Sequence, residues 1–343
     1  MVRPIVFYLP QFHPTPENDA WWGPGFTEWT NAAKAKPLFE GHYQPHVPAD
    51  LGFYDLRVPE TRAAQADLAR RYGIEGFCYY HYWFGDGRQL LERPFNEVLA
   101  SGEPDFPFCL CWANQSWTGI WHGAPNRMLM EQTYPGEADD TAHFEYLLKA
   151  FRDPRYITVE GRPLMLIFAP RNLPDPLAHC RRWRQMAEEA GLTGLHLLAV
   201  RIVADDWDAA AAGFDGSVEV RTPLVFSRNP AFVGVKIIDH RKMVDLEFRA
   251  SPVAHKQYPC VGHTWDNTPR SGLNGVVYVN SSPALFKSTV SRASAQLSDR
   301  PPEDQLLFIK SWNEWAEGNH LEPDLRYGHA WLEALRDGLP ETP

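Results

Sequence analysis

Two glutamates near the C-terminus are the residues whose types and spacing could do chemistry. Glu314 and Glu317 lie three residues apart in Ser-Trp-Asn-Glu-Trp-Ala-Glu-Gly (311–318), among tryptophans. Cleavage of a glycosidic bond needs a carboxyl group that protonates the leaving oxygen and a second carboxylate below the sugar ring. Apolar flanks raise a carboxyl pKa, which suits an acid near neutral pH. The alternative is a solvated acidic pair on the first turn of a helix, stabilised by the helix dipole.

Short apolar runs alternate with helical patterns along the chain, and these elements must position the pair. Strands are expected at 4–9, 74–80, 107–112, 163–168, 195–200, 214–220, 259–263 and 306–312. Helices are expected at 57–71, 89–100, 138–152, 175–190, 205–212, 239–256, 283–298 and 328–337. Asp175 is expected to begin its helix and Gly191 to follow its end.

Eight consecutive β/α repeats without a break in composition predict an α/β fold, a single (β/α)8 TIM barrel over 1–343. A doubly wound sheet is the alternative, but it usually has fewer strands and a Gly-rich first turn. No Gly-x-Gly-x-x-Gly or P-loop motif is present.

The barrel also predicts where a site would lie. Active sites of such barrels gather at the C-terminal ends of the strands, which places Asn313, Glu314 and Glu317 on the catalytic face. The long loops after strands 1, 3, 6 and 7 are expected at 10–56, 113–137, 221–238 and 264–282.

Aromatic and hydrogen-bonding side chains concentrate in these loops, and the chain has 13 Trp. Sugars bind through stacking of their apolar faces on aromatic rings and through polar partners for their hydroxyls. The candidate substrate-binding residues are Gln11, His13, Trp22, Glu28, Trp29, Gln44, His46, Tyr80, His81, Trp83, Trp112, Asn114, Gln115, Trp117, Asp266, Asn267, Arg270, Trp312, Asn313 and Trp315. For about half of those in the first loop, the alternative is that they only pin the loop.

Alternation along the second strand predicts Tyr80 and Tyr82 on one face and His81 and Trp83 on the other. His81 could either form a hydrogen bond with a substrate hydroxyl or be a structural histidine of the core. Asp266 and Arg270 could equally clamp a sugar or lock their loop.

The histidines of the first loop do not predict a metal site. The spacings of His13, His42 and His46 match no standard site, and Cys109 and Cys111 lack zinc spacing. We therefore expect no metal and no cofactor.

Composition excludes several classes of partner. The formal net charge is 33 − 43 = −10 without a basic run, which argues against nucleic acid or an anionic membrane. No stretch of 18 apolar residues occurs, so no membrane insertion is expected, and residues 1–10 resemble a strand, not a signal peptide. The cytoplasm is the expected compartment, and carbohydrate is the expected partner. The sequence does not indicate an oligomeric state.

Several motifs together resemble the WbsX family of bacterial polysaccharide-locus proteins, often labelled glycosyltransferases and similar to glycoside hydrolase family 99, the endo-α-mannosidases. The matching stretches are Tyr-Leu-Pro-Gln-Phe-His (8–13), Gly-Phe-Thr-Glu-Trp (25–29), Gly-His-Tyr-Gln-Pro-His (41–46), Asp-Leu-Gly-Phe-Tyr-Asp-Leu-Arg (50–57), Tyr-His-Tyr-Trp-Phe (80–84), Trp-Asp-Asn-Thr-Pro-Arg (265–270) and Trp-Asn-Glu-Trp-Ala-Glu-Gly (312–318).

The resemblance implies a (β/α)8 barrel, no metal in the chemistry and retention of anomeric configuration. It implies Glu314 as a base on the sugar's own 2-hydroxyl, giving an anhydro-sugar intermediate, and Glu317 as the acid/base. Spacing alone leaves an ordinary nucleophile mechanism open.

The chain departs from the family pattern at strand 3, where Gln115 and His122 replace acidic residues, and in 319–323. The expected function is a retaining glycoside hydrolase acting on a bacterial surface or related polysaccharide. A glycosyltransferase of polysaccharide (O-antigen) biosynthesis and a non-catalytic glycan-binding barrel are the alternatives. Asp139-Asp140 and Asp205-Asp206 fit helix caps rather than a diphosphate site.

Overall fold

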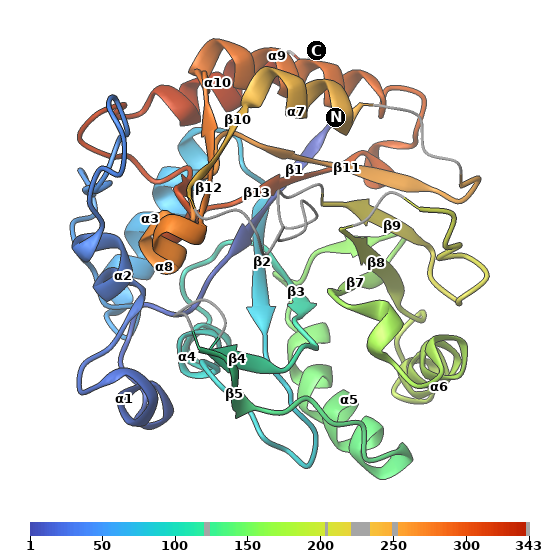
Figure 1. Ribbon diagram of the computed structural model, residues 1–343. Coiled ribbons are helices and arrows are strands. Elements are labelled where there is room, and N and C mark those ends of the chain that lie inside the picture. Colours follow the sequence, from blue (N-terminus) through green and yellow to red (C-terminus); the bar gives the residue numbers. More distant parts are fainter. Residues whose placement is uncertain (120–123, 203–204, 221–233, 249–252, 341–343) are drawn as a thin grey trace.

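Eight parallel strands close into a barrel in the computed structural model, which describes residues 1–119, 124–202, 205–220, 234–248 and 253–340 (Figure 1). The barrel strands are β1 (Arg3–Tyr8), β2 (Gly76–His81), β3 (Phe108–Trp112), β7 (Arg162–Ile167), β8 (His196–Arg201), β9 (Gly216–Glu219), β11 (Gln257–Gly262) and β13 (Leu306–Lys310). The short β6 (Thr158–Val159) adds an antiparallel hairpin to β7.

Ring closure comes from the pairing of the first barrel strand with the last, while the third and fourth barrel strands pair despite the insertions between them. β1 pairs with β13, and β3 pairs with β7 across the intervening β4–β6. The strands are buried along almost their whole length, as expected for a parallel sheet covered by helices. The predicted (β/α)8 fold is confirmed, and each strand begins and ends within two residues of its predicted bounds.

Helices cover the outside of the barrel. They are α3 (Pro59–Arg71), α4 (Arg93–Ser101), α5 (Glu137–Phe151), α6 (Pro176–Glu189), α7 (His240–Glu247), α9 (Pro283–Ala295) and α10 (Ala330–Gly338). Asp175 begins α6 as predicted, because its side chain accepts a hydrogen bond from the Ala178 N–H. Gly191 follows the end of α6 with a φ of 84°, which favours glycine.

The helix predicted at 205–212 is wrong, because the described residues 205–213 form bends and turns between β8 and β9. The Asp205 and Asp208 carboxylates accept hydrogen bonds from the Trp207 and Ala210 N–H groups. Such local bonds compete with the helical pattern. The helix predicted at 239–256 ends at Glu247, and residues 249–252 lie outside the described residues.

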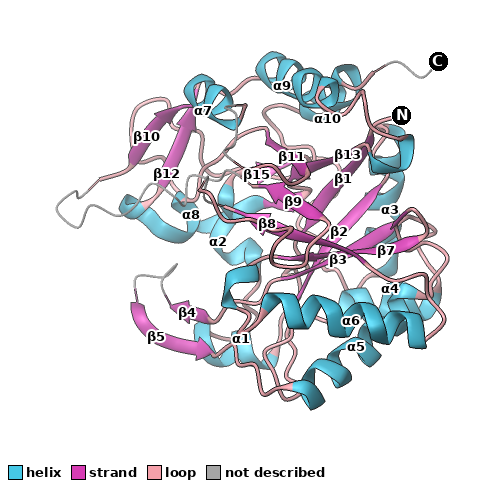
Figure 2. Ribbon diagram, turned by 90° about the vertical axis from the view of Figure 1, so that its right-hand side faces the viewer, coloured by secondary structure: helices cyan, strands magenta, loops and turns pink. Residues whose placement is uncertain are grey.

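The loops at the C-terminal ends of the strands carry extra elements. The first contains α1 (Pro16–Trp22) and α2 (Glu28–Lys34), and the loop after β3 contains the antiparallel pair β4 (Trp117–Gly119) and β5 (Ala124–Met130). The loop after β11 contains α8 (Thr268–Ser271) and β12 (Val276–Val279), which pairs with β10 (Lys236–Asp239). Of the predicted loop 221–238, residues 221–233 lie outside the described residues. Figure 2 shows the β4–β5 and β10–β12 pairs extending from the same end of the barrel.

The remaining short elements are 3-10 turns and a small ribbon. They are η2 (Pro170–Asn172), η4 (Gly272–Asn274), η5 (Pro302–Asp304), β14 (Asn313–Glu314), η6 (Trp315–Glu317) and β15 (Asn319–His320). Among the described residues, no helix has both the length and the apolar character needed to cross a membrane.

Candidate active site

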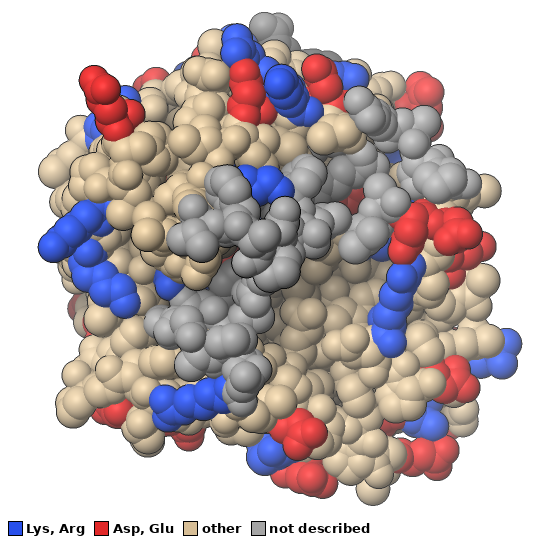
Figure 3. Space-filling view, in the orientation of Figure 1, with Lys and Arg blue, Asp and Glu red and all other residues tan. Residues whose placement is uncertain are grey.

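A cleft of about 540 Å³ opens at the C-terminal end of the barrel. Its lining is Leu9, Gln11, Trp22, Glu28, Asn31, Tyr80, Tyr82, Ala113, Gln115, Ser116, Trp117, Thr118, Leu129, Phe168, Asn172, Arg270, Lys310, Glu314 and Glu317. Figure 3 views this end of the molecule, where the coloured charged side chains stand mostly around the rim. A cleft with an aromatic wall and a charged floor has the character of a sugar-binding site.

Five charged side chains converge on the floor of the cleft. Arg270, in α8, places its Nη1 2.6 Å from Glu317 Oε1 and its Nη2 3.1 Å from Glu314 Oε2. The same guanidinium donates through Nε to Glu28 Oε1 at 2.7 Å, from the first turn of α2. Lys310, the last residue of β13, has its Nζ 3.4 Å from Glu317 Oε2 and 3.6 Å from Glu314 Oε1. Glu314 and Glu317 therefore share both cations.

Burial sets the electrostatics of this cluster. It raises the pKa of Glu317 above its ordinary value, the Glu314 charge adds to the rise, and Lys310 and Arg270 oppose it. Burial also raises the pKa of Glu28, against the attraction of Arg270. Three carboxylates face two cations, so one proton brings the cluster to neutrality. The raised pKa values favour that proton on Glu317 or Glu28.

Burial alone would lower the pKa of both cations. At Arg270 the charges of Glu28, Glu317 and Glu314 outweigh it, and the pKa stays above its ordinary value. The charges of Glu314 and Glu317 likewise outweigh burial at Lys310, and its pKa is raised above the ordinary value. Both side chains thus remain charged and hold the carboxylates in place.

The segment that follows β13 is tied to its neighbours by side-chain-to-backbone bonds. Asn313 makes two hydrogen bonds with the Leu9 backbone, at 2.7 and 2.9 Å, which fix it to the end of β1. Ser311 accepts from the Glu314 N–H and donates to the Asn319 carbonyl. Gly318 has a φ of 56°, and a Cβ there would lie 2.9 Å from the Asp266 Cβ. Glycine is required at this turn by both its conformation and its close approach.

A further buried glutamate, Glu322, lies behind the cleft. Glu322 accepts hydrogen bonds from the Tyr54 hydroxyl at 2.8 Å, from Gln65 Nε2 at 2.6 Å and from Trp315 Nε1 at 2.6 Å. Burial raises the pKa of Glu322 to about 7. These bonds hold Trp315, and with it the turn that carries Glu317.

The structure brings together some of the residues predicted for substrate binding and not others. Those that line the cleft with Glu314 and Glu317 are Gln11, Trp22, Glu28, Tyr80, Gln115, Trp117 and Arg270. Those outside the lining are His13, Trp29, Gln44, His46, His81, Trp83, Trp112, Asn114, Asp266, Asn267, Trp312, Asn313 and Trp315. The predicted alternation is confirmed, because Tyr80 and Tyr82 line the cleft while His81 and Trp83 contact His143 of α5.

The residues outside the lining have partners within the protein. Asp266 accepts from His42, Gln44 and Thr268, so its carboxylate locks the loop, and Asn267 accepts from the Val276 N–H. Asn114 bonds to Tyr134 and to the Ala169 backbone.

The outlying aromatic residues pack in the interior. Trp29 donates to the Tyr54 carbonyl and Trp112 to the Trp83 carbonyl. Trp312 packs on Phe77, and His13 is buried, which lowers its pKa. These interior positions give the side chains a structural place.

Lys310 is the main site residue absent from the predicted set. Its signal was a lone lysine in the otherwise apolar run Leu-Leu-Phe-Ile-Lys (306–310). A charged side chain in a buried strand is rarely without a partner. Asn31, Phe168 and Asn172 were also absent, because only the closed barrel turns their segments toward the cleft. Tyr82 was absent as well, although the strand alternation placed it on the same face as Tyr80.

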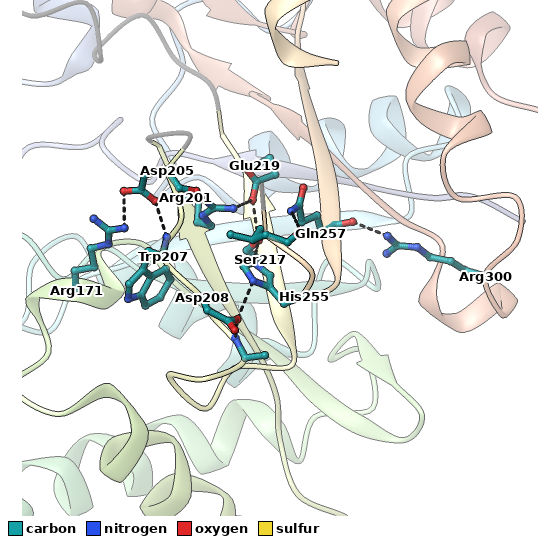
Figure 4. Close-up of polar contacts among 12 residues, drawn as sticks. Arg171, Arg201, Asp205, Trp207, Asp208, Ser217, Glu219, His255, Gln257 and Arg300 are labelled. Carbon is teal, nitrogen blue, oxygen red and sulfur yellow. Dashed lines mark hydrogen bonds and ion pairs between the residues drawn. The ribbon is translucent and has the colours of Figure 1, made fainter. Parts of the chain in front are cut away.

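A smaller cavity of about 160 Å³ adjoins the cleft and shares Phe168 and Asn172 with it. Its wall includes Trp207, whose ring lies 5.2 Å from the Arg171 guanidinium carbon. Figure 4 shows the polar contacts at this side, where Arg201 of β8 pairs with Glu219 of β9 at 3.1 Å. The cavity extends the space available to a ligand beyond the glutamate pair.

Three buried side chains outside the cleft could hold a metal ion. His46, His320 and Asp324 each offer one ligand atom, and these atoms lie within 4.8 Å of one another. They come from the first long loop, from β15 and from the turn after it.

His122, the second departure noted at strand 3, lies outside the described residues.

Comparison with known families decides the kinship of the chain. Residues 4–335 match the family described as Glycosyltransferase WbsX. The chain belongs to the WbsX family. Like the motifs that predicted this kinship, the match spans nearly the whole sequence.

Curated WbsX-like relatives include the uncharacterized protein WxcX of two strains of Xanthomonas campestris pv. campestris. Each is 42% identical over 351 residues, which cover 99% of this chain and 50% of WxcX. The chain therefore spans about half the length of the curated relatives it matches.

Solved structures with the same fold include a glycoside hydrolase-like protein, with a TM-score of 0.65, 14% identity, and coverage of 99% of this chain and 94% of that one. The GH99 endo-α-mannosidase of Bacteroides thetaiotaomicron, in complex with BIS-TRIS-propane, has a TM-score of 0.57 at 14% identity, covering 98% and 95%. At these identities the likeness establishes the fold, a barrel shared with glycoside hydrolases.

Proposed function

We propose that this WbsX-family chain is a retaining glycoside hydrolase that cleaves a bacterial surface or related polysaccharide. The observation that carries the proposal is the convergence of Glu314 and Glu317 on one cleft, with Arg270 and Lys310 shared between their carboxylates. Two carboxyl groups, one of them able to supply a proton, are what glycoside cleavage requires.

The roles are those that the family resemblance implies, and the electrostatics of Glu317 support its part. Glu317, with its raised pKa, holds the proton that the leaving glycosidic oxygen receives. Glu314 takes the proton of the sugar's 2-hydroxyl, whose oxygen attacks C1 and forms a 1,2-anhydro sugar. Water, deprotonated by Glu317, then opens this ring at C1, and O2 recovers its proton from Glu314. Two inversions at C1 give net retention.

The walls of the cleft suit a chain of sugars. Tyr80, Tyr82 and Trp117 present rings on which pyranose faces stack. Gln115 supplies an amide where the family pattern has a carboxylate, while Glu28 brings a third carboxylate from the opposite loop. The adjoining cavity near Trp207 leaves room for a further sugar unit.

The second candidate is a glycosyltransferase, which the family description favours. Such an enzyme must bind the diphosphate of a nucleotide sugar. In the described part of the cleft, the guanidinium of Arg270 and the ammonium of Lys310 are both engaged by glutamates. This neutralisation favours hydrolysis over transfer from an anionic donor.

The test is a digest of a panel of bacterial polysaccharides and oligosaccharides. Mass spectrometry identifies the products, and proton NMR identifies the anomer of the product that is released first. We expect shortened glycans whose new reducing end keeps its configuration. Consumption of a nucleotide sugar with a defined glycoside product would establish transfer instead. Sugar binding without turnover across the panel would indicate a glycan-binding barrel.

A further inference from the structure

A cluster of two histidines and one aspartate lies beside the candidate active site and takes no part in the proposed chemistry. His46 Nδ1 is 2.8 Å from His320 Nε2, and His320 Nε2 is 3.9 Å from Asp324 Oδ2. All three side chains are buried. They line a cavity of about 310 Å³ that is separate from the cleft and shares none of its lining residues.

The three atoms have the spacing of a ligand set. With all three within 4.8 Å of one another, a point equidistant from them lies roughly 2 to 2.4 Å from each, near the zinc–nitrogen and zinc–oxygen lengths of about 2.0–2.2 Å. The adjoining cavity leaves space for water as a further ligand. Two imidazoles and one carboxylate suit first-row divalent transition metals.

The surroundings already orient the ligand atoms. His320 Nδ1 lies 2.9 Å from the Glu322 carbonyl, to which it donates, so the Nε2 lone pair points at the cluster. Asp324 Oδ1 accepts from the Arg326 and Tyr327 N–H groups, which leaves Oδ2 toward His320. His46 Nδ1 must then donate to His320, and on metal binding Nδ1 gives up this proton while Nε2 takes one up, so that the imidazole binds in its neutral form.

We propose that His46, His320 and Asp324 form a structural site for a divalent first-row transition metal ion, with Zn²⁺ as the first ion to test. The ion joins the first long loop to β15 and to the turn at Asp324. His320 stacks on Trp315 at 3.6 Å between ring centroids, and Trp315 begins the turn that carries Glu317. The ion therefore stiffens the support of the glutamate pair without touching the substrate.

The experiment uses the tag-free full chain, stripped with a chelator and then titrated with Zn²⁺ and with Co²⁺. We expect one Zn²⁺ per chain by elemental analysis, Co²⁺ absorption bands of a low-symmetry nitrogen–oxygen site, and a Tm that rises with free metal, since ligands of the folded state stabilise it. No substrate is needed, so failure here leaves the proposed hydrolase function untouched.

Variants identify the ligands. His46→Gln and Asp324→Asn should each weaken Zn²⁺ binding by at least about tenfold. Asp324→Asn keeps the oxygen that accepts from the turn, so it tests the site even if His46→Gln folds poorly. The matched control is His329→Gln, a histidine bound to Asp50 and Tyr72 outside the cluster, which should bind like the parent. Absence of stoichiometric uptake, or equal uptake by all variants, would overturn the proposal.

Discussion

Glu317 and Glu322 are both buried glutamates of one segment, yet their carboxylates meet different surroundings. Glu317 lines the open cleft and is held by the cations Arg270 and Lys310. Glu322 lies behind it, where three neutral donors occupy its oxygens. Burial raises the pKa of both. A perturbed carboxyl group is therefore a candidate for chemistry only where a cleft gives a substrate access to it.

The largest expected effect is a loss of turnover, and it should distinguish Glu317, which lines the cleft, from Glu322, which lies behind it. Glu317→Gln and Glu314→Gln should each lower kcat about 10²- to 10⁴-fold, because the proton transfers are lost. Steady-state kinetics on the substrate found in the glycan panel measures this, with sugar binding by calorimetry as the control for folding. Unchanged turnover in Glu317→Gln would sink the assignment of the acid.

Removal of the central cation should destabilise the cleft side strongly. Arg270→Met removes the cation that Glu28, Glu314 and Glu317 share, and loss of one partner of a buried ion pair costs about 3–5 kcal/mol of unfolding free energy. Urea denaturation measures the loss. The double variant with Glu28→Gln should recover part of it, because one unpaired carboxylate is gone. No recovery would mean that Glu28 and Arg270 are not coupled.

Glu322→Gln tests the closed side of the comparison. One of its three donors would face an amide NH2 instead of an oxygen, which costs about 1–3 kcal/mol of unfolding free energy. Urea denaturation should show this loss, while kcat of the folded variant stays within a fewfold of the parent. A loss of kcat as large as that of Glu317→Gln would show that Glu322 is as important for turnover as Glu317, which would contradict the comparison.

The smallest expected effect is a shift in pH dependence. Lys310 lowers the pKa of Glu317, against the rise caused by burial and by Glu314, so Lys310→Met should raise that pKa further. In the proposed mechanism Glu317 protonates the leaving group, so the alkaline limb of the kcat profile should move to higher pH. If the alkaline limb of the Lys310→Met variant stays in place or moves to lower pH, the acid is a group other than Glu317.

Protonation of this cluster also affects stability. The pKa values of Glu28 and Glu317 are raised in the folded chain, so the folded state binds protons more tightly than the unfolded state. Their contribution to stability is complete below the unfolded pKa and declines as pH rises through the folded values.

The barrel could be predicted from the sequence because local patterns specify its strands. Buried parallel strands appear as short apolar runs, and all eight lie where those runs are. The turn segment 205–213 could not be predicted, because the hydrogen bonds that Asp205 and Asp208 accept from nearby N–H groups outweigh the alanine-rich pattern. The position of Glu314 and Glu317 beyond the C-terminal ends of the strands followed from the barrel itself.

What only the tertiary structure decided is which distant residues meet. Closure of the barrel pairs β1 with β13, and so brings the loop after β1 against the segment after β13. Glu28 thereby reaches Arg270 across 242 positions, and His46 reaches His320 across 274. The sequence determined the strands and the glutamate pair, since apolar periodicity and spacing are local. The partners of that pair depend on ring closure and on how each loop folds over the strand ends, which no local pattern records.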